Sequence, residues 1–280
     1  MRQNRKTDKS RPDSLAQAET PPHRAIPGAG DTAPNLRQVP AVTRAIAILR
    51  RLAASQMPLG LIQIARAEGI LPSTCLNILR VLVSEELVAF NAVTKRYSLD
   101  AGMLALTRPL LRPDSPGHRV QPHLDRMARE FKVTAALVEV IGLKHFIVIA
   151  VSRTEGLRLQ IDVGRRAPAL ISATGRCVAA FGNHPVDSLK LAFGLLRWDN
   201  APTFKGWLRE VELTRRRGYG VDEDNYISGM TTIAAPVLNR DDAMKYCLTA
   251  VGMSDQIRRS GRQAIAKALV SIAQSTFASN

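Results

Sequence analysis

The sequence lacks the segments that would place a protein in or across a membrane. No apolar run reaches the roughly 18 residues that a membrane-spanning helix needs, although hydrophobic residues make up 45% of the chain. The charged N-terminus contains no apolar stretch of the kind found in a signal peptide. We therefore expect a cytoplasmic protein without a membrane partner.

Cysteine is scarce, and the spacing of the cysteines fits neither a disulfide framework nor a zinc site. The three cysteines, Cys75, Cys177 and Cys247, are odd in number and far apart in the sequence. There is no CxxC pair and no His/Cys cluster, the patterns that indicate a disulfide framework or a structural zinc site. The sequence therefore predicts neither a disulfide framework nor a bound metal.

The motifs of common enzymes are also missing. The chain has no GxSxG elbow, P-loop, GxGxxG or HExxH sequence. Ser172 and Cys177 lie near the start of a predicted helix, where a nucleophile can be activated. No His or Asp is spaced to serve either residue as a partner, and the five histidines are scattered. We expect no enzymatic activity and no cofactor, and an enzyme is the weakest of the alternatives.

What the chain does have is an excess of positive charge. Its 280 residues, enough for two domains, carry a formal net charge of +15. Such an excess favours a polyanionic partner, either nucleic acid or an anionic membrane surface. A basic protein without any such partner is the alternative that charge alone leaves open.

Composition and periodicity divide the chain into four parts. Residues 1–38 are rich in Pro, Gly, Ala and charge, without hydrophobic periodicity, and predict a disordered basic tail. The tail can touch DNA phosphates or simply be solvated. The other predicted parts are a DNA-binding domain over 39–99, a linker helix in 100–117 and a second domain over 118–280.

The second part shows the order of a winged helix-turn-helix. Hydrophobic spacing predicts helices over about 41–54 and 60–68, and a third from Pro72, a residue suited to a first helical turn. Leu87–Phe90 and Arg96–Leu99 flank a polar turn and predict a β-hairpin. Three short helices followed by a hairpin are typical of this DNA-binding fold. The apolar residues at helical spacing in the first helix are Val42, Ala45, Ile46, Leu49 and Leu52. The predicted inner stripe of the third helix is Cys75, Ile78, Leu79 and Leu82.

The outer face of the third helix carries side chains suited to DNA. Ser and Thr donate to phosphates, Asn pairs bidentately with adenine, and Arg pairs with guanine or phosphate. Lys and Arg in the hairpin can reach the flanking backbone or minor groove. Any small helical domain has a polar outer face, so the prediction of DNA binding depends mainly on the order of the helices and the hairpin. The candidate DNA-binding residues are Ser73, Thr74, Asn77, Arg80 and Ser84 of the helix, with Lys95 and Arg96 of the hairpin.

The remainder of the chain mixes helices with strands. An amphipathic helix in 100–117 connects the two predicted domains, and it either transmits a signal between them or is only a spacer. Beyond it, helices alternate with apolar runs that have strand character, which favours an α+β domain with an antiparallel sheet. The predicted helices cover about 119–131, 186–195, 203–217, a segment opened by Ser172 and a single last helix from Ser254. The predicted strands are Thr134–Ile141, His145–Ser152, Leu157–Asp162, Thr232–Leu238 and Lys245–Met253.

Four stretches of the sequence resemble one family. They read LGLIQIARAEGILPSTCLNILRVLVSEELV, KRYSL, ATGRCVAAF and GYGVDEDNYISGMTTIAAPVLN, in this order along the chain. Together they resemble the IclR family of bacterial transcriptional regulators from about Val39 to the C-terminus. The last stretch is long and specific, with a Gly-Tyr turn, acidic residues and an Ile-Ala-Ala-Pro-Val strand.

The resemblance implies properties that composition does not. It implies a GAF-like sensor fold, a homodimer or dimer of dimers, and control of genes for small carboxylic or aromatic compounds. The sequence also departs from the family pattern. The family often has Arg at Asn77, Gly at Lys95, Lys at Arg176 and a polar residue at Val251.

By motif position, the resemblance implies an effector site in the C-terminal domain. A turn into a helix offers backbone N–H groups and a helix dipole to a carboxylate, and Thr hydroxyls donate to a carboxylate or carbonyl. Each residue also has an ordinary structural interpretation, as a strand, turn or helix-entry residue. The candidate effector-binding residues are Ala173, Thr174, Gly175, Asp222, Thr232, Thr249 and Val251.

The sequence therefore predicts a DNA-binding transcriptional regulator that responds to a small-molecule effector. Its partners would be double-stranded DNA with a pseudo-palindromic operator, a small carboxylate or aromatic acid, and a second copy of the chain. A DNA-binding or architectural dimer that senses nothing is the alternative.

Overall fold

The computed structural model describes residues 39–153, 161–239 and 244–277. The predicted tail over 1–38 lies outside these residues. Contacts divide the chain into two compact units, one ending at Ala105 and the other beginning at Leu106.

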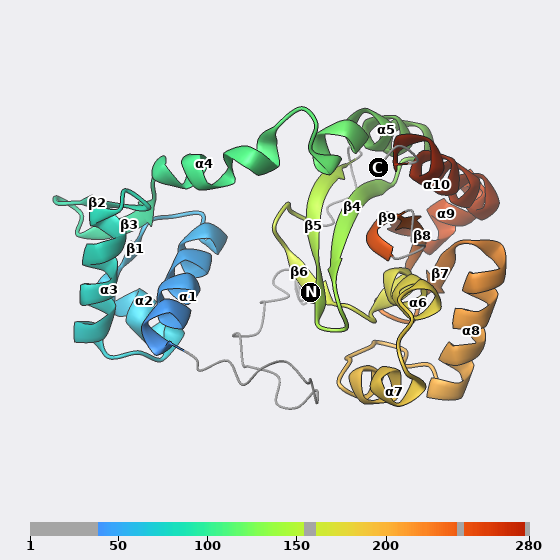
Figure 1. The fold of residues 1–280 in the computed structure, drawn as a ribbon, viewed down its shortest axis with the longest axis horizontal. Helices are drawn as coiled ribbons and strands as arrows, with labels where there is room; N and C mark the ends of the chain where they lie inside the picture. The colour runs from blue at the N-terminus through green and yellow to red at the C-terminus, as the bar shows by residue number, and fades with distance from the viewer. Residues whose placement is uncertain (1–38, 154–160, 240–243, 278–280) are drawn as a thin grey trace, which may run out of the picture. The chain divides into compact units, whose positions relative to one another are not determined.

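The first unit contains three helices and a three-stranded antiparallel sheet with the order β1-β3-β2 (Figure 1). Pro72 opens the third helix in its first turn, and Gly69 ends the second helix with a φ of 63°, a left-handed conformation that Gly adopts without strain. The elements are α1 (Pro40–Ala54), β1 (Leu59–Gly60), α2 (Leu61–Glu68), α3 (Pro72–Ser84), β2 (Val88–Asn91) and β3 (Arg96–Leu99). The predicted winged helix-turn-helix is confirmed.

One hydrophobic cluster joins the three helices to the hairpin. Its fully buried members are Ile48, Leu52, Ile64, Ala65, Cys75, Leu79, Leu82, Val88 and Tyr97. Not every apolar residue at helical spacing in α1 is buried, because Val42 is 56% exposed and Ile46 is 41% exposed. The apolar residues of α1 cover more than one face of the helix, so periodicity did not identify the buried stripe.

The connector follows the hairpin and spans the boundary between the units. It consists of α4 (Gly102–Thr107) and the 3-10 helix η1 (Arg108–Leu111). Four of its leucines are largely exposed: Leu104, Leu106, Leu110 and Leu111.

The second unit is built on a six-stranded antiparallel sheet with the order β6-β5-β4-β9-β8-β7. The pairing of β4 with β9 places the first strand of the unit beside the last. The strands are β4 (Thr134–Ile141), β5 (His145–Ser152), β6 (Arg166–Pro168), β7 (Gly220–Glu223), β8 (Met230–Leu238) and β9 (Met244–Met253). The predicted α+β class is confirmed.

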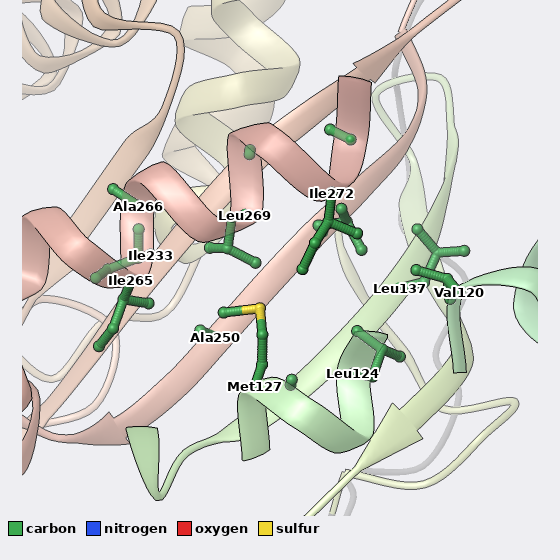
Figure 2. Close-up of a cluster of buried hydrophobic side chains, with 14 of the residues drawn as sticks. Val120, Leu124, Met127, Leu137, Ile233, Ala250, Ile265, Ala266, Leu269 and Ile272 are labelled. Atoms are coloured by element: carbon green, nitrogen blue, oxygen red, sulfur yellow. The ribbon is translucent and has the colours of Figure 1, made fainter. Parts of the chain in front are cut away.

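Helices cover both faces of this sheet. Helices α5 and α10 pack on one face, where the largest core cluster lies (Figure 2). Helix α6 covers the other face and packs in turn on α8 (Figure 1). The helices are α5 (Pro116–Phe131), α6 (Ser172–Phe181), α7 (Val186–Gly194), α8 (Phe204–Arg217), α9 (Ser254–Ser260) and α10 (Arg262–Phe277).

Two predictions for this unit need correction. The single last helix from Ser254 is in fact two helices, because Gly261 adopts a φ of 84° and interrupts them. Residues 157–160 of the predicted strand Leu157–Asp162 lie outside the described residues, and Ile161 and Asp162 are not in a strand. The edge strand after β5 is instead β6, a short element that period-2 alternation does not reveal.

Candidate DNA-binding face and effector site

The outward face of α3 presents the polar residues in one stripe. Ser73, Asn77, Arg80 and Ser84 recur every three or four residues, so they share a helix face, and all four are exposed. Thr74 lies beside them and is half-buried. Cys75, Leu79 and Leu82 occupy the opposite, buried face. The hydroxyl of Ser84 donates to the carbonyl of Val81 at 2.8 Å, which leaves its oxygen able only to accept.

The wing turn is held by its own side chains. The Oδ1 atom of Asn91 accepts from the backbone N–H groups of Val93 at 3.0 Å and Thr94 at 2.9 Å. Lys95 closes the turn with a φ of 56°, a conformation that favours Gly. This backbone conformation is the physical reason why Gly would suit this position. Arg96 donates to the carbonyl of Pro58 at 2.9 Å and so ties the wing to the segment before β1.

In the second unit, α6 begins in a tight and strained turn. Ser172 has a φ of 59°, which is unusual for a non-Gly residue. A Cβ atom at Gly175 would lie 1.9 Å from the carbonyl oxygen of Leu170, so only Gly fits there. The N–H of Gly175 donates to the carbonyl of Ile171 at 2.9 Å. The N–H of Gly175 is thus already paired within the helix, and the residue contributes close packing. The amides of the first turn, by contrast, have no partner within the helix.

A buried ion pair connects α6 to β7. Arg176 and Asp222 are each 2% exposed and lie 2.7 Å apart. The guanidinium also donates to the side chain of Asn225 at 2.8 Å and to the carbonyl of Ser172 at 3.1 Å. The second oxygen of Asp222 accepts from the N–H of Tyr226 at 3.1 Å. Both oxygens of Asp222 are therefore engaged, and the residue positions Arg176.

The remaining candidates lie across the sheet beneath α6. Asp222 pairs with Thr232, and Thr232 pairs with Val251, so directly opposed side chains form a row on one face. Thr249 lies one row further along β9, opposite Ala234. This face is the one that α6 covers, since Ala234 and Cys247 cluster with Ala173 and Cys177. The fold thus brings together Asp222, Thr232, Thr249 and Val251 under the start of α6.

Sequence reasoning missed three polar residues of this region. Arg176 was noted only as a departure from a family lysine, and its partner 46 residues away in the sequence could not be foreseen. Ser172 and Thr134 carry buried hydroxyls, and Thr134 extends the row because it pairs with Val251. An Arg in a segment of small residues was the one signal that the sequence offered.

Two cysteines that are far apart in the sequence meet between α6 and the sheet. Cys177 and Cys247 are free and fully buried, and the thiol of Cys177 lies 3.3 Å from the carbonyl of Ala234. Burial raises the pKa of Cys247 well above its ordinary value, and the hydrogen-bonded thiol of Cys177 raises it further. Burial also raises the pKa of Cys75 in the first unit, with a further contribution from Glu68.

These thiols are expected to resist alkylation in the folded protein. A thiolate is the reactive form, and burial keeps the reagent from all three thiols. The raised pKa of Cys75 and Cys247 also lowers their thiolate fraction. After iodoacetamide treatment at pH 7.5, intact-mass measurement should show no adduct on the native protein. The same treatment in guanidinium should label all three cysteines. An adduct on native Cys177 or Cys247 would contradict the packing of α6 on the sheet.

Within the described ranges, no group of three or more His, Cys, Asp or Glu residues is placed to hold a metal ion. No helix in the described part of the chain is long and apolar enough to cross a membrane.

Two family models match the two units. The IclR helix-turn-helix domain matches residues 41–92, and the bacterial transcriptional regulator IclR C-terminal domain matches residues 117–277. The glycerol operon regulatory protein of Streptomyces griseus is 30% identical over 226 residues, which cover 80% of this chain and 87% of that protein.

Solved structures share the fold. The crystal structure of an IclR regulator from Alicyclobacillus acidocaldarius aligns with a TM-score of 0.71 at 24% identity, covering 86% of this chain and 98% of that one. An IclR homologue from Microbacterium hydrocarbonoxydans complexed with 4-hydroxybenzoate aligns with a TM-score of 0.69 at 16% identity, covering 85% and 98%.

Proposed function

Because the chain belongs to the IclR family of bacterial transcriptional regulators, we propose that it reads a pseudo-palindromic operator as a dimer and that a small acid modulates this binding. It is a regulator with a helix-turn-helix DNA-binding domain and an effector-binding domain. We propose a DNA-binding domain over 39–99, a linker helix within 100–117 and an effector domain over 118–280. The matched relatives are transcriptional regulators, and we propose no catalytic activity for this chain.

The proposed DNA contacts follow from the exposed stripe of α3. Asn77 and Arg80 lie near its centre and read base edges in the major groove, while Ser73 and Thr74 donate to phosphates. Ser84 does so once its hydroxyl leaves the carbonyl of Val81. Lys95 and Arg96 of the wing reach the flanking backbone. The net charge of +15 supports binding to a polyanion.

The proposed dimer rests on exposed apolar side chains. Val42 and Ile46 of α1 and the four leucines of the connector are exposed to a degree that is unusual for large apolar residues in a monomer. A second copy that covers such residues would present two α3 helices to half-sites about one helical turn apart, roughly 34 Å.

The proposed effector site lies between the start of α6 and the sheet. The free amides of Ala173 and Thr174 at the positive end of the helix dipole, together with Arg176, favour an acid group. Thr232 and Thr249 offer hydroxyls, and Val251 supplies an apolar surface. Gly175 and Asp222 support this site by packing and by positioning Arg176. The Microbacterium homologue complexed with 4-hydroxybenzoate supports an aromatic acid as ligand here.

Selection of bound sites from random DNA tests the proposal as a whole. The purified protein would be used with and without a panel of small carboxylic and aromatic acids. A recovered palindrome whose occupancy changes with one acid supports both parts. Recovery of a sequence whose occupancy no acid changes would favour a regulator that does not sense these compounds, and recovery of no sequence would favour an architectural binder.

Asn77→Ala is expected to relax base preference at one position in each half-site. A bidentate contact to a base contributes about 1–3 kcal/mol of discrimination, and Asn77 is exposed, so its loss should leave the fold intact. The same selection experiment on the variant measures the change. Lys190→Ala, at an exposed position of α7, is the control and should leave the preference unaltered. Identical preference in wild type and Asn77→Ala would remove Asn77 from the reading face.

A further inference from the structure

Three buried polar atoms around the start of α6 and its sheet have no hydrogen-bond partner within the described ranges. They are Oγ1 of Thr134, Oγ of Ser172 and Nε of Arg176. Ser172 and Arg176 lie one turn apart on α6, at the site already proposed to hold an acid group. Thr134 is separate from them, because it stands at the start of β4. Its hydroxyl therefore needs another explanation.

Strand register places Thr134 at the far end of the same row. Thr134 pairs with Val251, Val251 with Thr232, and Thr232 with Asp222, so the row crosses four strands. Side chains directly opposed in a sheet share a face. Thr134 thus lies on the face that α6 covers, together with Ala136 and Val138 of its own strand.

Thr134 differs in chemistry from the residues of its own strand on this face. The next two residues of β4 on the same face, Ala136 and Val138, are apolar. Valine has the same shape as threonine and would fill the position without a hydroxyl. A fully buried hydroxyl with no partner lowers the stability of the folded protein. Such an unpaired group calls for an explanation, and a bound molecule that supplies the missing partner is one.

We propose that Thr134 is a specificity-determining residue, whose hydroxyl binds a second oxygen group of the effector at the end remote from its acid group. The inference rests on the effector site proposed above. At that site the acid group is held by Arg176 and by the amides of Ala173 and Thr174 at the start of α6. Val251 lies between the two polar ends of the row and contacts the apolar middle of the ligand.

The row limits the form of the ligand. Its second oxygen group must lie across the sheet from the acid group, with an apolar middle against Val251. An aromatic acid with a hydroxyl group para to its carboxylate carries its two oxygen groups at opposite ends of an apolar ring.

Thr134→Val separates this role from a structural one, because the two roles predict opposite changes in the melting temperature of the free protein. Titration calorimetry would compare benzoate with 4-hydroxybenzoate, which differ only in the hydroxyl group. We expect wild type to bind 4-hydroxybenzoate about tenfold more tightly than benzoate, because one neutral hydrogen bond to the hydroxyl is worth up to about that factor. In Thr134→Val this preference should disappear, while the melting temperature of the free protein should rise.

Thr231→Val is the matched control. Thr231 is equally buried, but it is on the other face of β8, and its hydroxyl donates to Ser254 at 2.9 Å. This variant should lower the melting temperature and keep the preference for 4-hydroxybenzoate. Operator binding without ligand should be equal in all three proteins.

Several results would overturn the inference without contradicting the proposed function. One is a preference for 4-hydroxybenzoate that survives in Thr134→Val. Another is a lower melting temperature of that variant, which would mean that the hydroxyl already has a partner. A third is that wild type binds its operator but neither acid. Failure of wild type to select any DNA would instead count against the proposed function itself.

Discussion

Asp222→Ala is expected to lower the free energy of unfolding of the C-terminal domain by about 3–5 kcal/mol, the usual cost of breaking a buried ion pair from one side. Arg176 is 2% exposed and would keep its charge without the carboxylate that now lies 2.7 Å away. The side chain of Asn225 and the carbonyl of Ser172 would remain as partners, but neither carries a charge. Both tryptophans, Trp198 and Trp207, lie in this domain, so urea unfolding followed by tryptophan fluorescence reports on it.

Two further variants separate charge from packing in this experiment. Glu212→Ala removes ion pairs with Arg215 and Arg216 on the surface of α8, where both partners are exposed, and should change stability by less than about 1 kcal/mol. The double variant Arg176→Met with Asp222→Leu removes both buried charges and should recover part of the loss. A loss in Asp222→Ala no larger than that in Glu212→Ala would contradict burial of the pair.

Gly175→Ala is expected to destabilise the same domain by about 3 kcal/mol or more, at or beyond the upper end of ordinary overpacking. The added Cβ atom would lie 1.9 Å from the oxygen and 2.0 Å from the carbon of the Leu170 carbonyl. Because these atoms are backbone, no side chain can rotate away, and the start of α6 itself must shift. The same shift would displace Ala173 and Thr174, so effector binding should weaken together with stability.

Gly194→Ala is the control for this substitution. Gly194 is the last residue of α7, and a Cβ atom there would meet nothing within 4 Å. Ala is the better helix former, so this variant should be neutral or more stable by up to about 1 kcal/mol. Thermal unfolding followed by circular dichroism compares the two variants directly. Equal melting temperatures would show that α6 does not approach Leu170 as closely as the structure indicates.

The elements whose signals are local were predictable from the sequence. The helices of the first unit, the hairpin and most strands of the second unit follow from hydrophobic spacing and turn residues. The α3 stripe was also predictable, because residues three or four apart on a helix share a face whatever surrounds them. Errors arose where the local signal was ambiguous. Val42 and Ile46 fit a helical stripe but lie outside the core, and Gly261 divides a helix that periodicity made continuous.

For the effector site, the sequence by itself determined the residue types, and motif resemblance indicated Ala173, Asp222, Thr232 and Thr249. Only the tertiary structure decided which of them lie side by side. The pairing of Arg176 with Asp222, and the alignment of Thr134 with Val251, depend on the register of strands that are far apart in the chain. A one-residue slip in register would turn every side chain of a strand to the other face. That register is set by the burial of the whole sheet between α6 on one side and α5 with α10 on the other, and no local pattern encodes it.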